Sequence, residues 1–448
     1  MPDDATDIGQ QMWSWARDLF PICRSITGPG VRETLDYLTR LLPGLTQHAV
    51  PSGTPAFDWI VPDEWTIRDA YVADEGGRRV IDFQQSNLHL MGYSVPVDAW
   101  MTRAELDAHL YSLPDQPDAI PYVTSYYQRR WGFCLSHNDR QNLPEGRYHV
   151  VIDADLAPGV LNYGELILPG RESGEVLLST YICHPSLANN ELSGPVVTAA
   201  LAQWLSVMED RRYTYRIIFI PETIGAIVYL SMHLAEMKAK TVAGFVVTCV
   251  GDDRAYSYLA SRKGSTLADR AALYSLNRHA PSFERFSFLS RGSDERQFGS
   301  AGVDLPVCSI LRTRYGSYPE YHTSLDNMDL IRPEGLAGAL RALQSAILAV
   351  EVNRVPTASF YCEPHYSKYG LKGRLIGGQP LPGAEQLTSN IVAYADGTMD
   401  LIEMAGLFDK DISELDRLAS ELERLGIVTC NPPTFSIADQ GKTDRNHS

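Results

Sequence analysis

The stretch STYICHPSLANNELSGP, residues 179–195, decides the fold of this chain. It continues an apolar run, GEVLLSTYI at 174–182, of the kind that forms a strand buried on both faces of a sheet. A polar loop with His184 follows, and an apolar helical pattern begins at Pro195, a residue favoured in the first turn of a helix. A buried strand, a polar loop and a helix in this order indicate an α/β sheet.

The same alternation continues outward from this stretch. Apolar strand patterns at 215–221 and 244–250 are separated by a helical pattern, and a long apolar helix is expected at 334–352. Near-continuous apolar strands that alternate with helices indicate a sheet covered by helices on both faces. We therefore predict one α/β domain, formed by residues 165–360 and by the helical patterns of residues 1–45.

Two segments depart from this alternation. Between residues 46 and 164, short β-like runs alternate with Pro, Gly and Asp turns, which predicts a small, mainly β inserted subdomain. Residues 361–448 contain three helical patterns, and a strand pair is expected around IVTC and FSIA. Three helices and a hairpin are the outline of a winged helix. The helical patterns cover 384–395, 399–408 and 411–426.

Composition and charge exclude several classes of protein. The 448 residues include 39 Lys and Arg and 55 Asp and Glu, a net charge of −16, which disfavours binding to a phosphate backbone. The third helix of the predicted winged helix carries five acids and two bases, so we expect the domain to pack or to form a homo-oligomer, not to bind nucleic acid. Scattered cysteines, no secretory pattern and no apolar run of about 18 residues predict a cytoplasmic protein without a membrane span.

Chemically active side chains follow three of the predicted strands. His184, Glu222 and Asp252 come after the first, second and third strand, and the loop PEYHTSLDN at 319–327 adds His322. Each residue alone also fits a structural role, such as a hydrogen-bonded histidine or a turn aspartate. Since ligands bind at the carboxyl ends of parallel strands, we expect these residues to converge there. Imidazole and carboxylate donors suit zinc, and a spare glutamate suits a general base in metal-assisted hydrolysis.

The order of these motifs resembles a known family. His184, ANNELSG, PETIG, GDD and YHTSLDN are similar to the M28 class of zinc aminopeptidases. The chain is more closely similar to the bacterial aminopeptidase-like proteins of DUF4910 type, which carry a DUF2172-like insert and a C-terminal winged helix and are associated with polysaccharide biosynthesis. RSITGPG (24–30), SYYQRRWGFC (125–134) and FIPETIG (219–225) extend the resemblance over nearly the whole chain. The resemblance implies a zinc-aminopeptidase-like mixed sheet.

The resemblance also implies a role for each residue of the predicted site. His184, Asp252 and His322 match zinc ligands of M28 enzymes. Glu222 matches the general base, which acts on a zinc-bound water.

Two positions depart from the M28 pattern. Asn190 stands where those enzymes have an aspartate that bridges two metals, and Thr223 stands where they have a second, metal-binding glutamate. A neutral amide is a poor bridge between two cations. We therefore expect one zinc ion per chain, with Glu191 or Asn190 as a further ligand.

Six further residues are expected to contact the substrate. One lies in RGSDERQF, where M28 relatives have a Ser-Asp near the pocket, and two precede His322. Three lie in an aromatic segment of the insert that we expect to cover the pocket, although these aromatics could instead form the core of the insert. The six are Asp294, Arg312, Tyr321, Tyr126, Tyr127 and Arg130.

These observations favour one function and leave two alternatives open. The expected function is that of a zinc-dependent hydrolase of aminopeptidase type, which cleaves an amide bond in a small peptide-like or aminoacylated metabolite. A single-zinc acyltransferase or cyclase on the same scaffold, similar in fold class to glutaminyl cyclases, is the first alternative. The second is a non-catalytic binding or regulatory protein, against which the retention of Glu222 argues.

Overall fold

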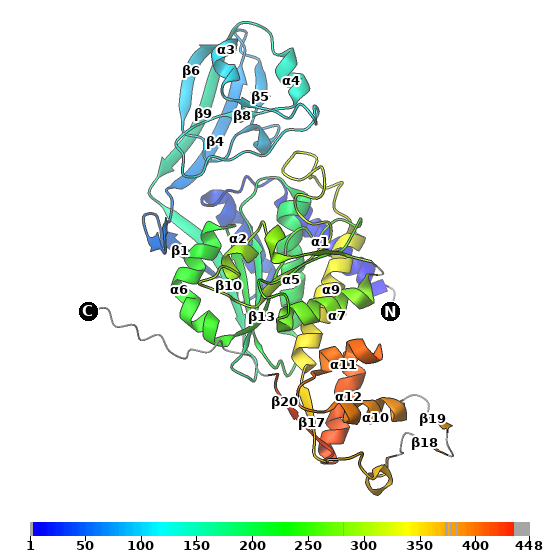
Figure 1. The fold of residues 1–448 in the computed structure, drawn as a ribbon. Coiled ribbons are helices and arrows are strands. Elements are labelled where there is room, and N and C mark those ends of the chain that lie inside the picture. The colour runs from blue at the N-terminus through cyan, green and yellow to red at the C-terminus, as the bar shows by residue number, and fades with distance from the viewer. Residues whose placement is uncertain (1–2, 281, 372–374, 377–378, 381–383, 434–448) are drawn as a thin grey trace, which may run out of the picture.

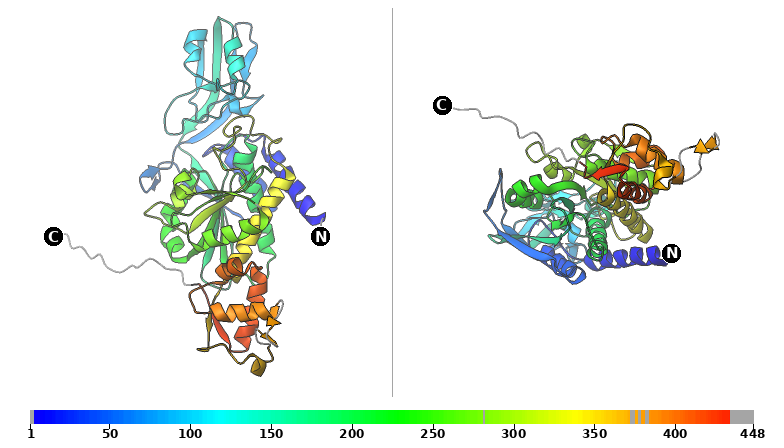
Figure 2. Two further views of the ribbon diagram at one scale, coloured as in Figure 1. Left: turned by 45° about the vertical axis from the view of Figure 1, so that its right-hand side comes forward. Right: turned by 90° about the horizontal axis from the view of Figure 1, so that it is seen from below.

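The structure, a computed structural model, describes residues 3–280, 282–371, 375–376, 379–380 and 384–433. It is elongated: a central α/β domain carries the inserted subdomain at one end and the C-terminal domain at the other (Figures 1 and 2).

An eight-stranded mixed sheet forms the centre of the molecule, as predicted. Its strand order is β1-β10-β12-β11-β13-β16-β14-β15. β12, β11, β13 and β16 are parallel to one another. β10 is antiparallel to its neighbours β1 and β12, and β14 is antiparallel to β16 and parallel to β15. The strands are β1 (Thr46–Pro51), β10 (Val160–Leu168), β11 (Glu175–Tyr181), β12 (Thr214–Ile220), β13 (Thr241–Val246), β14 (Ser257–Leu259), β15 (Glu284–Phe286) and β16 (Val307–Leu311).

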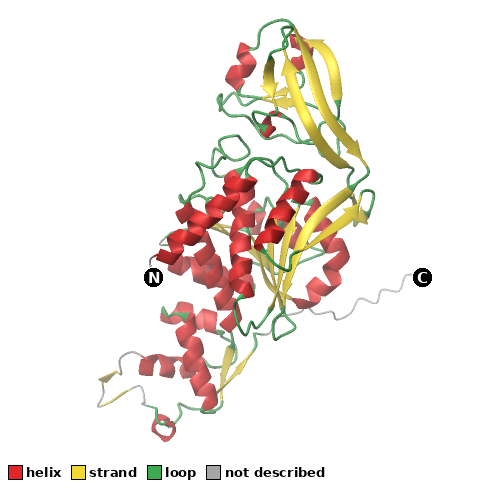
Figure 3. Ribbon diagram, turned by 180° about the vertical axis from the view of Figure 1, so that it is seen from behind, coloured by secondary structure: helices red, strands yellow, loops and turns green. Residues whose placement is uncertain are grey.

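Helices cover both faces of this sheet (Figure 3). Successive residues of a strand point to opposite faces, so Leu178 joins one core while Leu177 joins the other. The first core holds α1 (Asp3–Leu19), α2 (Pro29–Leu41), α5 (Ser193–Ser206), α7 (Leu267–His279) and α9 (Pro333–Val352). The second core holds α6 (Ile224–Lys240) and the short α8 (Glu295–Phe298).

Helix α9 is the only helix in the described part of the chain that is long and apolar enough to cross a membrane. However, 67% of its apolar window is buried inside the molecule, where it packs in the first core. Its apolar surface is therefore explained by its place in the protein core.

The inserted subdomain is built on a four-stranded antiparallel sheet of order β5-β4-β9-β6. Its elements are β2 (Pro55–Ala56), β3 (Trp59–Ile60), β4 (Glu64–Ala73), β5 (Arg79–Asp82), β6 (Val97–Thr102), α3 (Arg103–Asp107), β7 (Leu110–Tyr111), β8 (Phe133–Cys134), α4 (His137–Asn142) and β9 (Arg147–Ala157). The predicted boundaries, 46 and 164, differ from this arrangement, because β1 and β10 belong to the central sheet. Their pairing joins residues over 100 positions apart, and a local sequence pattern does not reveal it.

The C-terminal domain contains the three expected helices, α10 (Ala384–Tyr394), α11 (Leu401–Phe408) and α12 (Ile412–Arg424). Its strand β20 (Val428–Asn431) pairs with β17 (Val355–Ala358), so the domain begins before residue 361. A second pair is formed by β18 (Leu375–Ile376) and β19 (Gln379–Pro380). The predicted strand at FSIA lies outside the described residues. The apolar stripe of α12 is buried in the first core, together with α7 and α9.

A buried polar network fixes the C-terminal domain to the central one. The Asp400 carboxylate caps α11 and accepts hydrogen bonds from Asn353 Nδ2, at 2.9 Å, and from Arg270 Nη2, at 2.7 Å. Asn353 Oδ1 in turn accepts a hydrogen bond from the backbone N–H of Ile402, at 3.2 Å.

Asp400→Ala is expected to lower the free energy of unfolding by about 2 kcal/mol, because it removes a helix cap and leaves a buried Asn353 donor and a partly buried Arg270 donor without an acceptor. Equilibrium denaturant unfolding measures the change. Asp409→Asn, at an exposed position at the opposite end of the same helix, is the control and is expected to change the free energy by less than about 0.5 kcal/mol. Equal effects of the two substitutions would contradict the assigned role of Asp400.

Candidate metal site

Two of the predicted residues meet at the carboxyl ends of the central strands. His184 follows β11 and Glu222 follows the neighbouring β12, and His184 Nε2 lies 3.6 Å from Glu222 Oε2. His322 comes from the loop after β16, and its ring centroid lies 5.7 Å from that of His184. The structure therefore brings together three of the four residues that the sequence predicts at this site.

The other ring nitrogen of His184 faces a buried ion pair. Nδ1 lies 2.8 Å from Glu191 Oε2, and Glu191 Oε1 lies 3.3 Å from Nε of Arg24. Burial alone would lower the pKa of His184, but the hydrogen bond to Glu191 and the charges of Glu191 and Glu222 outweigh it and raise the pKa. For His322, burial and the charge of His184 lower the pKa to about 3, so its imidazole is neutral.

A buried carboxylate connects the loops that carry the two histidines. Asp326, four residues after His322, accepts hydrogen bonds from the backbone N–H groups of Ala188, Asn189 and Asn190, at 2.6–3.1 Å. These belong to the π-helical turn η2 (Ala188–Leu192). Burial raises the pKa of Asp326 to about 6, although these hydrogen bonds oppose the shift.

Glu222 is held by its neighbours on the other side of the site. Ser293 Oγ donates a hydrogen bond to Glu222 Oε1, at 2.8 Å, and the Glu222 backbone N–H donates to Cys183 Sγ, at 3.2 Å. Burial raises the pKa of the Glu222 carboxyl, and the charge of His184 partly offsets this shift. A carboxylate with a raised pKa and a fixed orientation is suited to accept a proton.

Asp294 and Arg296 support the residue after Glu222. The Thr223 N–H donates to Asp294 Oδ1, at 2.7 Å, and Arg296 Nη2 donates to Thr223 Oγ1, also at 2.7 Å. Burial and the charge of Glu222 raise the pKa of Asp294 well above its ordinary value. Asp294, expected to contact substrate, thus lies at the site, and its Oδ2 is buried without a hydrogen-bond partner. Arg296 was not identified from the sequence.

Strained backbone concentrates at this site. Thr223 has a φ of 64° and His322 a φ of 58°, in a region that β-branched and bulky residues rarely adopt. Tyr126, Ser186 and Cys249, in the adjoining loops, also have positive φ. Such strain persists where the surroundings over-determine it, typically at functional sites.

Tyrosines enclose the two histidines. The ring of Tyr122, from the insert, lies 5.2 Å from that of His184 and 5.1 Å from that of His322. Its backbone N–H donates to the His322 carbonyl, at 2.8 Å, and its hydroxyl lies 3.0 Å from that of Tyr126. Tyr321 stacks on His322 at 3.9 Å. The insert therefore covers the site through Tyr122, which the sequence analysis missed, and Tyr126, which it named.

Asp252 is not brought to this group by the structure. Its carboxylate accepts four hydrogen bonds, from Asn189 Nδ2, the backbone N–H and hydroxyl of Thr313, and the backbone N–H of Arg254, at 2.7–3.1 Å. A carboxylate offers about four acceptor positions, so these bonds occupy it. Asp252 therefore links the loops that carry Asn189, Arg254 and Thr313. This role differs from the expected one as a metal ligand.

Three of the expected substrate contacts also lie elsewhere. The Arg312 guanidinium lies 3.9 Å from the ring of Tyr256, on the α9 side of the sheet. Tyr127 is 48% exposed and donates to the Ile60 carbonyl within the insert. Arg130 is exposed on the same segment. Adjacent positions in a sequence do not fix where side chains point, which explains these differences.

Imidazole nitrogens at the site are available to hold a metal ion. His322 Nε2 and Asn190 Oδ1 are buried without a hydrogen-bond partner, and His184 Nε2 faces Glu222. Within the described residues, one group of three His, Cys, Asp or Glu side chains has its donor atoms within 4.8 Å of one another: Cys183, His184 and Glu191. That group lies on the Nδ1 side of His184, where Arg24 already supplies a positive charge. Because the Arg24 charge repels a second cation, a metal ion is better accommodated on the Nε2 side of His184.

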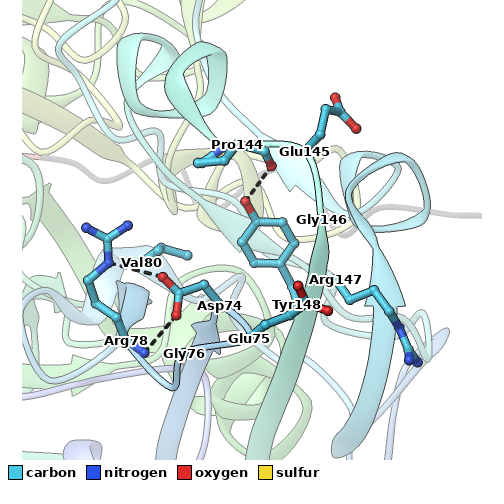
Figure 4. Close-up of a pocket in the computed structure, with 10 residues that line it drawn as sticks. All are labelled: Asp74, Glu75, Gly76, Arg78, Val80, Pro144, Glu145, Gly146, Arg147 and Tyr148. Carbon is cyan, nitrogen blue, oxygen red and sulfur yellow. Dashed lines mark hydrogen bonds and ion pairs between the residues drawn. The ribbon is translucent and has the colours of Figure 1, made fainter.

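A separate hollow lies in the insert and has no part in this site (Figure 4). Three of its polar side chains already have partners within it: Asp74 pairs with Arg78, at 3.2 Å, and the Tyr148 hydroxyl donates to the Pro144 carbonyl, at 2.6 Å.

Residues 13–353 match the model of a domain of unknown function, DUF4910, and residues 354–430 match that of a winged helix-turn-helix. The chain belongs to the DUF4910 family. It is 40% identical over 427 residues, 95% of this chain and 97% of the relative, to a Clostridium acetobutylicum protein named for polysaccharide biosynthesis and an aminopeptidase-like domain.

Solved structures agree with this assignment of the fold. The crystal structure of a candidate peptidase from Clostridium acetobutylicum is 38% identical, with a TM-score of 0.88, and the match covers 95% of this chain and 97% of that one. A zinc aminopeptidase from Bacillus subtilis is 12% identical, with a TM-score of 0.56 over 76% of this chain and 94% of that one. This second likeness shows the shared aminopeptidase-like fold.

Tyr122→Ala is expected to lower the free energy of unfolding by about 3 kcal/mol, because it removes a partly buried aromatic ring, and to open the site. Modification of His184 and His322 by diethyl pyrocarbonate, followed by mass spectrometry, is expected to become faster. Tyr127→Ala, an exposed tyrosine of the same segment, serves as the control and is expected to leave both histidines protected. Unchanged protection in Tyr122→Ala would show that Tyr122 does not cover the site.

Proposed function

We propose that this protein is a single-metal amide hydrolase of aminopeptidase type. The observation that carries the proposal is a partly buried Glu222 carboxylate 3.6 Å from His184 Nε2, with the ring of His322, whose Nε2 is buried and unpartnered, 5.7 Å from that of His184. His184, His322 and the side-chain Oδ1 of Asn190 would hold the ion. Two imidazole nitrogens and one oxygen leave an open position, which is the pattern of catalytic zinc sites.

Each residue of the site has a distinct task in this proposal. A bound zinc ion would polarise the amide carbonyl and lower the pKa of water toward about 7. Glu222 Oε2 takes a proton from the attacking water and returns it to the leaving amine, while Ser293 keeps the carboxylate in place through Oε1. Tyr122 and Tyr126 exclude bulk water, and burial keeps their hydroxyls protonated and able to donate a hydrogen bond.

Arg296 supports one metal ion over two. Its guanidinium lies 2.7 Å from the hydroxyl of Thr223, the position at which the M28 pattern has a second carboxylate ligand. A hydroxyl paired with a fixed cation is a poor site for a second metal cation, because like charges repel at this distance.

The cover over the site supports a small substrate. His184 is 3% exposed, and Tyr122 of the insert lies against both histidines. A short peptide or an aminoacylated metabolite fits such a site better than a folded protein does. The relative named for polysaccharide biosynthesis directs attention to N-acylated amino sugars as one class of amide to examine.

The alternatives can be separated by their products. A single-zinc acyltransferase or cyclase would use the same His184 and Glu222 but would transfer the acyl group to an amine or hydroxyl instead of water. The protonated hydroxyls at the site and its closure are compatible with either reaction, whereas the enclosed Glu222 favours catalysis over a non-catalytic binding role. Mass spectrometry of products formed in ¹⁸O-labelled water distinguishes hydrolysis from transfer.

We expect the purified protein to contain about one zinc ion per chain. His184→Ala and His322→Ala are expected to lose it, because each removes a ligand, whereas Asp252→Asn is expected to keep it, because Asp252 already accepts four hydrogen bonds within the loop. Elemental analysis after dialysis measures the content. If Asp252→Asn lost its zinc while His184→Ala and His322→Ala kept theirs, Asp252 would be the metal ligand and the proposed ligand set would be wrong.

Glu222→Gln is expected to reduce amide hydrolysis by a factor of about 10²–10⁴, because the amide cannot accept the proton, while zinc remains bound. Single-turnover assays on a panel of short peptides and N-acyl amino sugars, with parallel metal analysis, test this. Full hydrolysis by the variant would remove Glu222 from the mechanism. Loss of zinc together with activity would make Glu222 a ligand and not the base.

A further inference from the structure

The motif RSITGPG, residues 24–30, takes no direct part in the proposed reaction, but its first residue contacts the site. Its first residue, Arg24, lies between α1 and α2, 160 positions before His184, and its guanidinium is fully buried. Nη1 donates to the Leu19 carbonyl, at 2.8 Å, and Nε donates to the carbonyl of His184, at 3.0 Å. Arg24 therefore fixes the main chain of a residue at the site as well as a neighbouring carboxylate.

Arg24 and Glu191 form an ion pair without exposure on either side chain. Taking two charges out of water is costly, and such a pair contributes little net stability compared with apolar residues of the same size. A role in stability alone therefore explains the pair poorly. The position of the pair indicates a role at the site, because the second carboxylate oxygen of Glu191 lies 2.8 Å from His184 Nδ1.

This contact determines which nitrogen of His184 carries a proton. An ionised carboxylate only accepts hydrogen bonds, so Nδ1 must be the donor to Glu191. In the neutral imidazole, Nε2 then presents its lone pair to the side where Glu222 and His322 lie. A carboxylate behind a histidine ligand commonly fixes the orientation and the tautomer of that histidine.

We propose that Arg24 and Glu191 are positioning residues, which hold His184 with its proton on Nδ1 and its Nε2 lone pair directed at the metal position. Glu191 is therefore not itself a metal ligand. The inference rests on the proposed function for the identity of the ion, but the orientation of His184 is a property of the metal-free protein. The helical N-terminal segment thereby becomes part of the site, through a single arginine.

The test compares two buried glutamates of the same chain. Glu191→Gln is expected to weaken zinc binding 10- to 100-fold, measured by competition with a chromophoric chelator. Glu175→Gln is the matched control, because Glu175 is also buried and pairs with Arg216, at 2.7 Å, away from the site. The control is expected to destabilise the fold but to bind zinc as the wild type does. Equal zinc affinity in Glu191→Gln and the wild type would overturn the proposal.

A second readout does not depend on the metal. In metal-free protein labelled with ¹⁵N-histidine, NMR at alkaline pH is expected to show His184 with its proton on Nδ1, and Glu191→Gln is expected to lose this preference. A proton on Nε2 in the wild type would overturn the proposal, even if the protein bound no zinc and the proposed function failed.

Arg24→Lys provides a variant for the case in which Glu191→Gln does not fold. It keeps the positive charge but loses the Nε hydrogen bond to the His184 carbonyl, so zinc affinity is expected to fall by a smaller factor than in Glu191→Gln. Unchanged zinc affinity together with an unchanged His184 tautomer would contradict the role of Arg24.

Discussion

The Asp326 carboxylate is the interaction on which the site depends. It accepts hydrogen bonds from three successive backbone N–H groups of the turn η2, which carries Asn190 and Glu191, while its own loop carries His322. One buried side chain thus joins the loop after β11 to the loop after β16. The order of the strands alone does not set the distance of 5.7 Å between the ring centroids of His184 and His322.

The two ring nitrogens of His184 face different charged groups. On the Nδ1 side, Arg24 neutralises Glu191, so that side is complete without a metal ion. On the Nε2 side, Glu222 lies 3.6 Å from His184, and in the adjoining loops His322 Nε2 and Asn190 Oδ1 have no hydrogen-bond partner. Arg296 occupies the place beside Thr223. The physical expectation is one cation on the Nε2 side, in a site closed by tyrosines from the insert.

Much of this arrangement follows from the sequence. Apolar strand patterns that alternate with helices predicted the mixed sheet, and the rule that ligands bind at the carboxyl ends of parallel strands predicted that His184 and Glu222 meet. The rule names the residue after a strand but not the direction of its side chain. Asp252 and Arg312 therefore face other partners than expected, and only tertiary contacts reveal Tyr122 and Arg24. The place of β1 in the central sheet likewise depends on pairing across more than 100 residues.

The central claim is that a single metal ion lies on the Nε2 side of His184. Crystals of the full chain grown with zinc, and measured at the zinc absorption edge, test it most directly. The account predicts one anomalous peak within bonding distance of the Nε2 atoms of His184 and His322, with Glu222 close to it. A peak between Cys183 and Glu191, a peak at Asp252 or two peaks in the site would contradict the account.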